Sequence, residues 1–330
     1  MQQETPSLQE IYDPIQVDLD RVKEKIDREL THNDAYVHGL LEHARKFRGK
    51  MLRPALLLSS ASICGTQPEE IHVHLSAVIE ILHHATLIHD DVLDEADMRR
   101  RVSTLNHTWG NEASVLFGDY IFARAYSLCA KIHHREANQI FSQTVEEICL
   151  GELTQTAAKF QFDLSEERYF EMIRLKTAVL FSTACRLGSI NTNAPKETIE
   201  NLAHFGECFG VAFQIIDDAL DLTGEEDEVG KSLGTDLLKG KTTLPLRHHF
   251  RKISKPKKES LITLLQSKEE IKIKRNEIVS HLMENDIHSE ILSKAGEYIS
   301  KAKSHIHLLP DSQGKTHLLS LADFALARRK

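Results

Sequence analysis

Two groups of aspartates with the same spacing are the residues of this sequence best suited to chemistry. They are Asp90, Asp91 and Asp94, and Asp217, Asp218 and Asp221. If each group lies in a helix, its first and last aspartates stand one turn apart on one face, where like charges repel. Divalent cations remove that repulsion, and oxygen-only ligands suit Mg²⁺ in particular. Because Mg²⁺ is usually shared with substrate phosphates, two facing acidic helix ends predict a site for a strongly anionic ligand bridged by metal.

One such motif alone is weak evidence, because a short acidic pattern can equally be the solvated end of a helix. The two copies here share the D-D-x-x-D spacing, and each follows an apolar helical stretch. Repetition in the same setting makes coincidence a poor explanation.

Basic residues are available to bind the anion. Lys50 and Arg53 lie three positions apart, so they share one side of a helical turn, and Pro54 follows directly. The other candidates follow the first aspartate group or lie further along the chain: Arg99, Arg100, Arg101, Lys176, Lys231 and Lys241. Guanidinium groups bind phosphate oxygens in pairs and lysines act as point charges, so the set suits two diphosphates rather than one. Any one of these residues alone would more often form a surface ion pair.

The elements that must position these side chains are helices. No proline occurs between Pro68 and Pro195, and apolar residues recur there at helical spacing, as at Leu75, Ile79 and Leu82. Helix breaks are expected at residues 65–68, 101–104, 162–165, 191–195 and 224–240. Ser165, followed by two glutamates, is expected to cap a helix. We expect one all-α domain over residues 1–330, with about ten to thirteen helices and residues 1–14 flexible.

Composition excludes several classes of protein. The chain has 330 residues and a formal net charge of −8, whereas a general nucleic-acid binder is usually basic. Its five cysteines form no C-x-x-C pair, which argues against a disulfide framework and a thiolate zinc site. The N-terminus lacks the pattern of a signal peptide, and no uninterrupted apolar run approaches the ~20 residues of a membrane span. We therefore expect a cytoplasmic protein without a membrane span or a nucleic-acid partner.

An ordered set of motifs extends this pattern. It comprises Gly49-Lys50-x-x-Arg53-Pro54, His83-x-Ala85-Thr86-Leu-Ile-His-Asp90-Asp91-x-x-Asp94, Asp97-Met-Arg99-Arg100, Gly151-Glu-Leu-x-Gln155, Lys176-Thr177, Phe213-Gln214-x-x-Asp217-Asp218-x-x-Asp221, and Gly230-Lys231 through Gly240-Lys241-Thr-Thr-Leu-Pro245. From about residue 40 to residue 250, the chain resembles the trans-isoprenyl diphosphate synthases, and in particular the long-chain octaprenyl and heptaprenyl enzymes. Such an ordered set is highly specific.

The resemblance implies a helical bundle of the isoprenoid synthase type around a central cavity, and a homodimer. It implies head-to-tail condensation of isopentenyl diphosphate with an allylic diphosphate, with two or three Mg²⁺ ions per active site. All six aspartates would bind Mg²⁺. The allylic substrate would contact Arg99, Lys176, Thr177, Gln214, Lys231 and Lys241. Isopentenyl diphosphate would contact Lys50, Arg53, His83 and Arg100. Arg101, often a small residue in relatives, and the longer spacing before Lys241 depart from the family pattern.

Product length has a physical ruler in the helix that precedes Asp90. One helical turn spans 5.4 Å, roughly one isoprene unit, so residues one turn before the anchored diphosphate decide early termination. Ala85 and Thr86 are small there, where short-chain relatives commonly carry an aromatic ring, and Leu82 and Ile79 would line a deeper tunnel. This predicts a long product, about C30 to C50. Alternatively, Ala85 and Thr86 merely permit close helix packing.

Three other functions remain open from the sequence. A short-chain synthase would make a C15 or C20 product by the same chemistry. A catalytically silent partner subunit would keep the helical scaffold, although neither acidic motif is degraded here. A terpene cyclase shares the helical architecture and one acidic motif, but two complete motifs with Gly49-Lys50-x-x-Arg53-Pro54 favour chain elongation over cyclisation.

Overall fold

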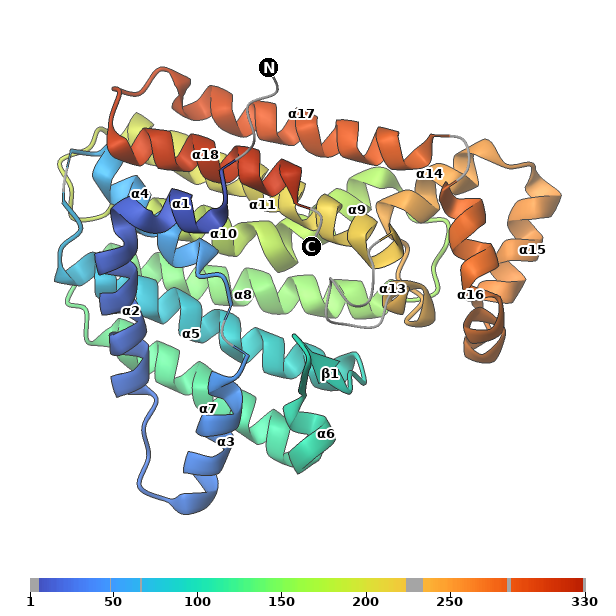
Figure 1. The fold of residues 1–330 in the computed structure, drawn as a ribbon, viewed down its shortest axis with the longest axis horizontal. Coiled ribbons are helices and arrows are strands. Elements are labelled where there is room, and N and C mark those ends of the chain that lie inside the picture. Colours follow the sequence, from blue (N-terminus) through green and yellow to red (C-terminus); the bar gives the residue numbers. More distant parts are fainter. Residues whose placement is uncertain (1–5, 48, 66, 224–233, 284–285, 329–330) are drawn as a thin grey trace.

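The computed structural model describes residues 6–47, 49–65, 67–223, 234–283 and 286–328. It confirms the all-α prediction: long helices run side by side along the molecule (Figure 1). Within the described residues the strands are two short segments, β1 (Met98–Arg99) and β2 (Val102–Ser103), which pair antiparallel with Met98 opposite Ser103. This hairpin follows the helix that carries the first aspartate group.

The helices follow one another in chain order. The first are α1 (Leu8–Tyr12), the 3₁₀ turn η1 (Asp13–Ile15), α2 (Gln16–Glu29), α3 (Ala35–Arg45), α4 (Leu52–Ile63) and α5 (Glu70–Leu93). After the hairpin come α6 (Leu105–Trp109), α7 (Asn111–Ala130), α8 (Arg135–Ala157), α9 (Glu166–Ile173), the π-helical turn η2 (Arg174–Ala178), α10 (Val179–Gly188) and α11 (Lys196–Thr223). The last are α13 (Thr235–Leu238), α14 (Leu244–Lys252), α15 (Lys255–Leu265), α16 (Lys268–Met283), α17 (Ile287–His307) and α18 (Gln313–Ala327).

The described residues form seventeen α-helices, more than the ten to thirteen expected from average helix length. Several are single turns of four or five residues, such as α1, α6 and α13. The expected breaks at 65–68, 101–104, 162–165 and 191–195 all lie between helices. Of the break expected at 224–240, residues 224–233 lie outside the described residues, and residues 235–238 form the single-turn helix α13 instead of a break. The Ser165 hydroxyl accepts a hydrogen bond from the Arg168 backbone, which confirms the predicted helix cap.

The core is built around two central helices, α5 and α11. Helix α5 packs against α4 and α7, while α11 packs against α10 and α17. Over an 18-residue window α5 is apolar enough to span a membrane, but 67% of that window is buried inside the fold, as befits a core helix. A separate apolar cluster holds α13 to α16 together at one end of the molecule (Figure 1).

The N-terminal segment for which flexibility is expected is partly ordered. Residues 8–12 form α1, where Ile11 and Tyr12 are buried in the main core. The Tyr12 hydroxyl donates a 2.7 Å hydrogen bond to the backbone carbonyl of Lys50. Burial of two large side chains therefore fixes this segment beside the loop that carries Lys50.

Candidate active site

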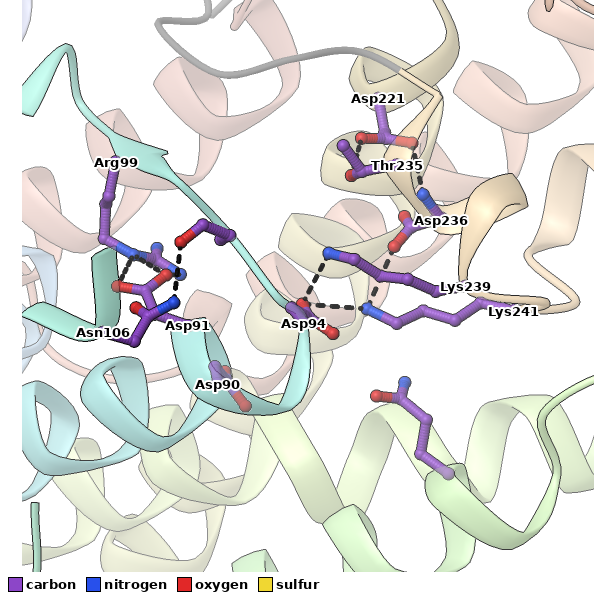
Figure 2. Close-up of polar contacts among 12 residues, drawn as sticks. Asp90, Asp91, Asp94, Arg99, Asn106, Asp221, Thr235, Asp236, Lys239 and Lys241 are labelled. Carbon is purple, nitrogen blue, oxygen red and sulfur yellow. Dashed lines mark hydrogen bonds and ion pairs between the residues drawn. The ribbon is translucent and has the colours of Figure 1, made fainter. Parts of the chain in front are cut away.

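The two aspartate groups lie at the C-terminal ends of the two central helices. Asp90 and Asp91 occupy the last turn of α5, and Asp94 caps it. The second group lies near the end of α11. A chain of polar contacts joins the two ends: Asp94 to Lys241 (3.4 Å), Lys241 to Asp236 (3.0 Å), and the Asp236 backbone nitrogen to the Asp221 carboxylate (3.1 Å) (Figure 2). The structure thus brings both predicted motifs to one site.

Asp90 meets a lysine from across the site. Its carboxylate lies 3.3 Å from the Lys176 ammonium, which also donates to Gln155 at 3.0 Å and pairs with Glu152 at 2.6 Å. Burial and the neighbouring Asp90 carboxylate raise the pKa of Glu152 to about 7. Three acceptors therefore hold the Lys176 ammonium at the mouth of the site.

Asp91 faces away from this lysine and toward the hairpin. Arg99, in β1, donates from Nε to both oxygens of Asp91, at 2.8 and 3.0 Å, and from its terminal nitrogen at 2.8 Å (Figure 2). Asp91 is 4% exposed, and burial raises its pKa even though Arg99 opposes the change. This pair anchors the hairpin to α5.

Asp94 is held by two lysines of one turn. Its carboxylate lies 3.0 Å from the ammonium of Lys239 and 3.4 Å from that of Lys241 (Figure 2). Although burial would raise it, the two ammonium groups lower the pKa of Asp94 to about 2. Asp94 is therefore ionised throughout the physiological range.

The second motif, like the first, contains both partly exposed and buried aspartates. Asp217 is 37% exposed and forms a 3.0 Å ion pair with Arg328. Asp218 is buried, accepts hydrogen bonds from the Tyr169 hydroxyl (2.7 Å) and the Gln214 amide (2.8 Å), and has a pKa raised to about 7 by burial and by nearby Asp236.

Asp221 is almost wholly buried, at 1% exposure. Its two oxygens accept from the Thr235 hydroxyl at 2.9 Å and from the Asp236 backbone at 3.1 Å, both in α13 (Figure 2). These contacts fix the turn that follows α11 to the end of that helix.

The π-helical turn η2 positions two further predicted residues, Lys176 and Thr177. Helix α8 packs so closely on this turn that a Cβ on Gly151 would lie 2.6 Å from the Lys176 backbone nitrogen. The Thr177 hydroxyl donates a 2.8 Å hydrogen bond to the side-chain oxygen of Gln214. These side chains line a cavity of about 70 Å³ that Asp218 and Lys241 also border. Extra residues in a helical turn of this kind often mark functional sites.

The second predicted cation group gathers between the start of α4 and the hairpin. Arg53 lies with its guanidinium 4.2 Å from the centre of the Phe181 ring, and burial lowers its pKa to about 10. Arg100 adopts a left-handed backbone conformation and donates to the Phe47 carbonyl at 2.5 Å. Its guanidinium fills the space beside Gly49, where a Cβ would lie 2.9 Å away.

His83 faces this cation group from α5. Burial and the Arg53 charge hold the pKa of His83 well below its usual value, so its ring is neutral at pH 7. The Lys50 ammonium lies 5.8 Å from the centre of the Phe324 ring of α18. The structure therefore groups Arg53, His83 and Arg100. Lys231 lies outside the described residues.

The four predicted chain-length residues lie along α5. Ala85, Leu82 and Ile79 are fully buried. Thr86 is half-buried, and its hydroxyl donates a 2.8 Å hydrogen bond to the His83 carbonyl. Both the tunnel and the close-packing interpretations are compatible with this burial.

Several site residues escape the sequence analysis. Tyr169, Asp236, Lys239 and Arg328 all contact the motif carboxylates. Tyr169 and Arg328 lie outside the motifs quoted above, while Asp236 and Lys239 lie within the 230–245 motif but have no assigned role there. Gln155 lies in a quoted motif without an assigned role. Lys239 stands two positions before Lys241, which is the one local signal that could have found it.

The donor set fits a hard divalent cation. The carboxylates of Asp90, Asp94 and Asp217 are 20%, 22% and 37% exposed and offer oxygen atoms alone. In the part of the chain that the structure describes, no three His, Cys, Asp or Glu side chains lie close enough together to hold a metal ion by themselves. Mg²⁺ does not require such a group, because it keeps several waters and substrate oxygens as ligands.

Comparison with known proteins defines the class. A family model described as polyprenyl synthetase matches residues 34–282. The nonaprenyl diphosphate synthase of Mycobacterium tuberculosis is 35% identical over 93% of this chain and 91% of that protein. Component 2 of the heptaprenyl diphosphate synthase of Geobacillus stearothermophilus is 31% identical over 96% of this chain and 97% of that protein.

The structural likeness agrees. The crystal structure of a polyprenyl synthase from Caulobacter crescentus, complexed with calcium and isoprenyl diphosphate, superposes with a TM-score of 0.94. It covers 99% of this chain and 100% of its own, at 30% identity. The chain belongs to the polyprenyl synthetase family. It is accordingly a prenyltransferase of the polyprenyl diphosphate synthase class with the isoprenoid synthase fold.

Proposed function

We propose that this chain is an Mg²⁺-dependent synthase that condenses isopentenyl diphosphate with an allylic diphosphate, head to tail, into a long-chain all-trans polyprenyl diphosphate. The observation that carries the proposal is the pairing at the site: three partly exposed aspartates, Asp90, Asp94 and Asp217, each lie against a cation. Carboxylates that attract metal and cations that attract phosphate are thus already assembled in one place.

The six aspartates divide into two roles. We assign metal binding to Asp90, Asp94 and Asp217, whose oxygens reach solvent. Asp91 and Asp221 are buried and position Arg99 and α13. Asp218 holds Gln214 through a hydrogen bond. This narrows the six predicted metal ligands to three that bind directly and three that orient their surroundings, a usual division in metal sites.

The reaction follows from the chemistry of these residues. Mg²⁺ bound to the aspartates would neutralise the charge that develops on the diphosphate leaving group. Lys176 and Lys241 bind diphosphate oxygens as point charges. The oxygens of Thr177 and Gln214 supply fixed dipoles that stabilise the allylic cation as the C–O bond breaks. No protein nucleophile is needed.

The second substrate occupies the other cation group. Arg53 and Arg100 bind the diphosphate of isopentenyl diphosphate, and neutral His83 adds a hydrogen-bond donor without further charge. We assign Lys50 to the same diphosphate on the basis of its motif. The double bond of this substrate attacks the allylic cation and forms the new C–C bond. The proton lost from the product passes to the released pyrophosphate, which restores the alkene.

Three observations support a long product. Ala85 and Thr86 place no ring one turn before Asp90. Leu82 and Ile79 continue the apolar surface of α5. Relatives of this chain include heptaprenyl, octaprenyl and nonaprenyl diphosphate synthases. The geranylgeranyl diphosphate synthase of Methanosarcina mazei is also 31% identical to this chain. The product assay must therefore also be able to detect a short-chain product.

We propose that the chain works as a single-domain subunit of a homodimer in the cytoplasm. Large apolar side chains lie exposed on α7 and α8: Val115, Leu116, Tyr126, Leu150 and Leu153. An apolar face of this kind on two adjacent helices is typical of a subunit interface. The five cysteines are free, which accords with a reducing compartment.

The deciding experiment incubates the purified chain with labelled isopentenyl diphosphate, farnesyl diphosphate and Mg²⁺, and sizes the dephosphorylated products by chromatography. Products of C30 or longer support the proposal; C20 products identify a short-chain synthase, and cyclic products a terpene cyclase. Absence of turnover in a folded, metal-loaded chain would favour the partner-subunit alternative. That alternative is tested because one relative is named as component 2 of a heptaprenyl diphosphate synthase.

A further inference from the structure

The turn between α13 and α14 presents two lysines to one carboxylate. Lys239 and Lys241 flank Gly240, and both ammonium groups lie within 3.4 Å of the same Asp94 oxygen (Figure 2). The turn itself is well held: the Gly240 carbonyl accepts a 2.8 Å hydrogen bond from the Phe160 backbone. A Cβ on Gly240 would lie 2.5 Å from the Phe160 ring, so the segments that carry Gly240 and Phe160 are in close contact. The lysines therefore project from a fixed backbone toward the end of α5.

The two lysines differ in their remaining contacts. Lys241 also forms a 3.0 Å ion pair with Asp236, whose backbone is bound in turn to Asp221. Among the described residues, Asp94 is the one carboxylate within ion-pair distance of Lys239. A divalent cation that takes the Asp94 carboxylate leaves Lys241 with its second partner. It leaves Lys239 with none.

We propose that Lys239 is a further diphosphate-binding residue, held by Asp94 in the ligand-free protein and transferred to the allylic diphosphate when a divalent cation binds Asp94. The proposal rests on the proposed function, because it needs the same metal and the same anion. A lysine ammonium is a compact charge on a flexible stem, so rotation of the side chain is enough to exchange partners. Its side chain is 18% exposed and faces the site, so the exchange does not require unfolding of the turn.

Removal of this charge has two consequences of opposite sign. Without Lys239, Asp94 loses a competing cation, so the protein alone binds metal more tightly. The metal-bound protein then lacks one diphosphate contact and binds the anion more weakly, by about tenfold for one charge-assisted hydrogen bond. If Lys239 merely stabilised the turn, its removal would weaken the binding of both the metal and the diphosphate.

The test compares Lys239→Met with Lys239→Arg and with Lys255→Met, which removes an exposed lysine outside the site. Mn²⁺ binding to the protein alone is followed by electron paramagnetic resonance. Pyrophosphate binding in the presence of Mg²⁺ is followed by calorimetry. We expect Lys239→Met to bind Mn²⁺ several-fold more tightly and pyrophosphate about tenfold more weakly. Lys239→Arg and Lys255→Met stay close to the parent chain.

The kinetic arm separates the two substrates. Lys239→Met should raise the KM for farnesyl diphosphate and leave that for isopentenyl diphosphate unchanged. Circular dichroism confirms that each variant folds. If Lys239→Met binds pyrophosphate as the parent does, or weakens Mn²⁺ and pyrophosphate together, the inference is wrong while the proposed function stands. If the parent chain itself binds no pyrophosphate and shows no turnover, the proposed function fails.

Discussion

Arg328 forms a 3.0 Å ion pair with Asp217, so the end of the described chain lies at the second acidic motif. Its guanidinium also stacks over the Phe213 ring, 4.1 Å from the ring centre, and the side chain is only 10% exposed. The C-terminal helix α18 thus delivers a cation to a carboxylate that we assign to metal binding.

This ion pair predicts competition between Arg328 and the metal. Arg328→Gln should lower the Mg²⁺ concentration that gives half-maximal turnover, about two- to fivefold for one partly exposed pair. Arg251→Gln, which breaks an exposed ion pair with Glu166 away from the motifs, is the matched control and should leave the value unchanged. A rise in the required Mg²⁺ concentration would mean that Arg328 assists the metal instead of competing with it.

The metal requirement is the second prediction. EDTA should abolish turnover and Mg²⁺ should restore it. Asp90→Ala and Asp217→Ala should each lower kcat by orders of magnitude without loss of helical signal, because transition-state charge stabilisation is removed. Asp163→Ala, an exposed aspartate outside both motifs, serves as control. Near-normal turnover in either motif variant would overturn the assignment.

The buried aspartates should respond differently. Asp221→Asn removes the charged acceptor of the Thr235 and Asp236 hydrogen bonds, so we expect it to lower the free energy of unfolding by about 1–3 kcal/mol. Its remaining activity should need the same Mg²⁺ concentration as the parent chain. Thermal unfolding and a metal titration measure the two effects. A large shift in metal requirement with unchanged stability would make Asp221 a direct ligand.

The two cation groups predict separable substrate sites. Arg53→Gln should raise the KM for isopentenyl diphosphate by about tenfold or more, since a charge-assisted contact is lost. Arg99→Gln should weaken binding of the allylic substrate and raise its KM, because Arg99 orients Asp91 beside Asp90. Arg53→Lys is the control, because it keeps the positive charge but removes the two parallel hydrogen bonds that a guanidinium makes to a phosphate. The division into two sites fails if Arg53→Gln affects only the allylic KM.

Product length is tested at Thr86. Thr86→Phe adds a ring one turn before Asp90 and should shift products to C15 or C20 while condensation continues. Thr86→Val keeps the side-chain volume and should leave the product distribution unchanged, although it removes the hydroxyl that donates to His83. Chromatography of the dephosphorylated alcohols gives the lengths. Unchanged product lengths in Thr86→Phe would mean that residues other than Thr86 limit chain elongation.

Much of this protein follows from local sequence. The helices and their breaks are local properties, since apolar periodicity, proline positions and caps such as Ser165 act over a few residues. The grouping of Asp90 with Asp94 needs only the 3.6-residue repeat of a helix. The motif order then assigned the family, which the comparisons confirm.

What only the tertiary structure decided is which partner each charge meets. The ion pairs of Lys176 with Asp90, Lys239 with Asp94 and Arg328 with Asp217 join residues far apart in the chain. Their formation depends on how α5, η2, α11, α18 and the turn after α13 pack together, and no local pattern records that packing. Burial likewise separates Asp91 and Asp221 from the exposed aspartates of their own motifs. Identical spacing gives equal propensity to bind metal, but solvent access and neighbouring charge, which are long-range properties, determine which carboxylates can do so.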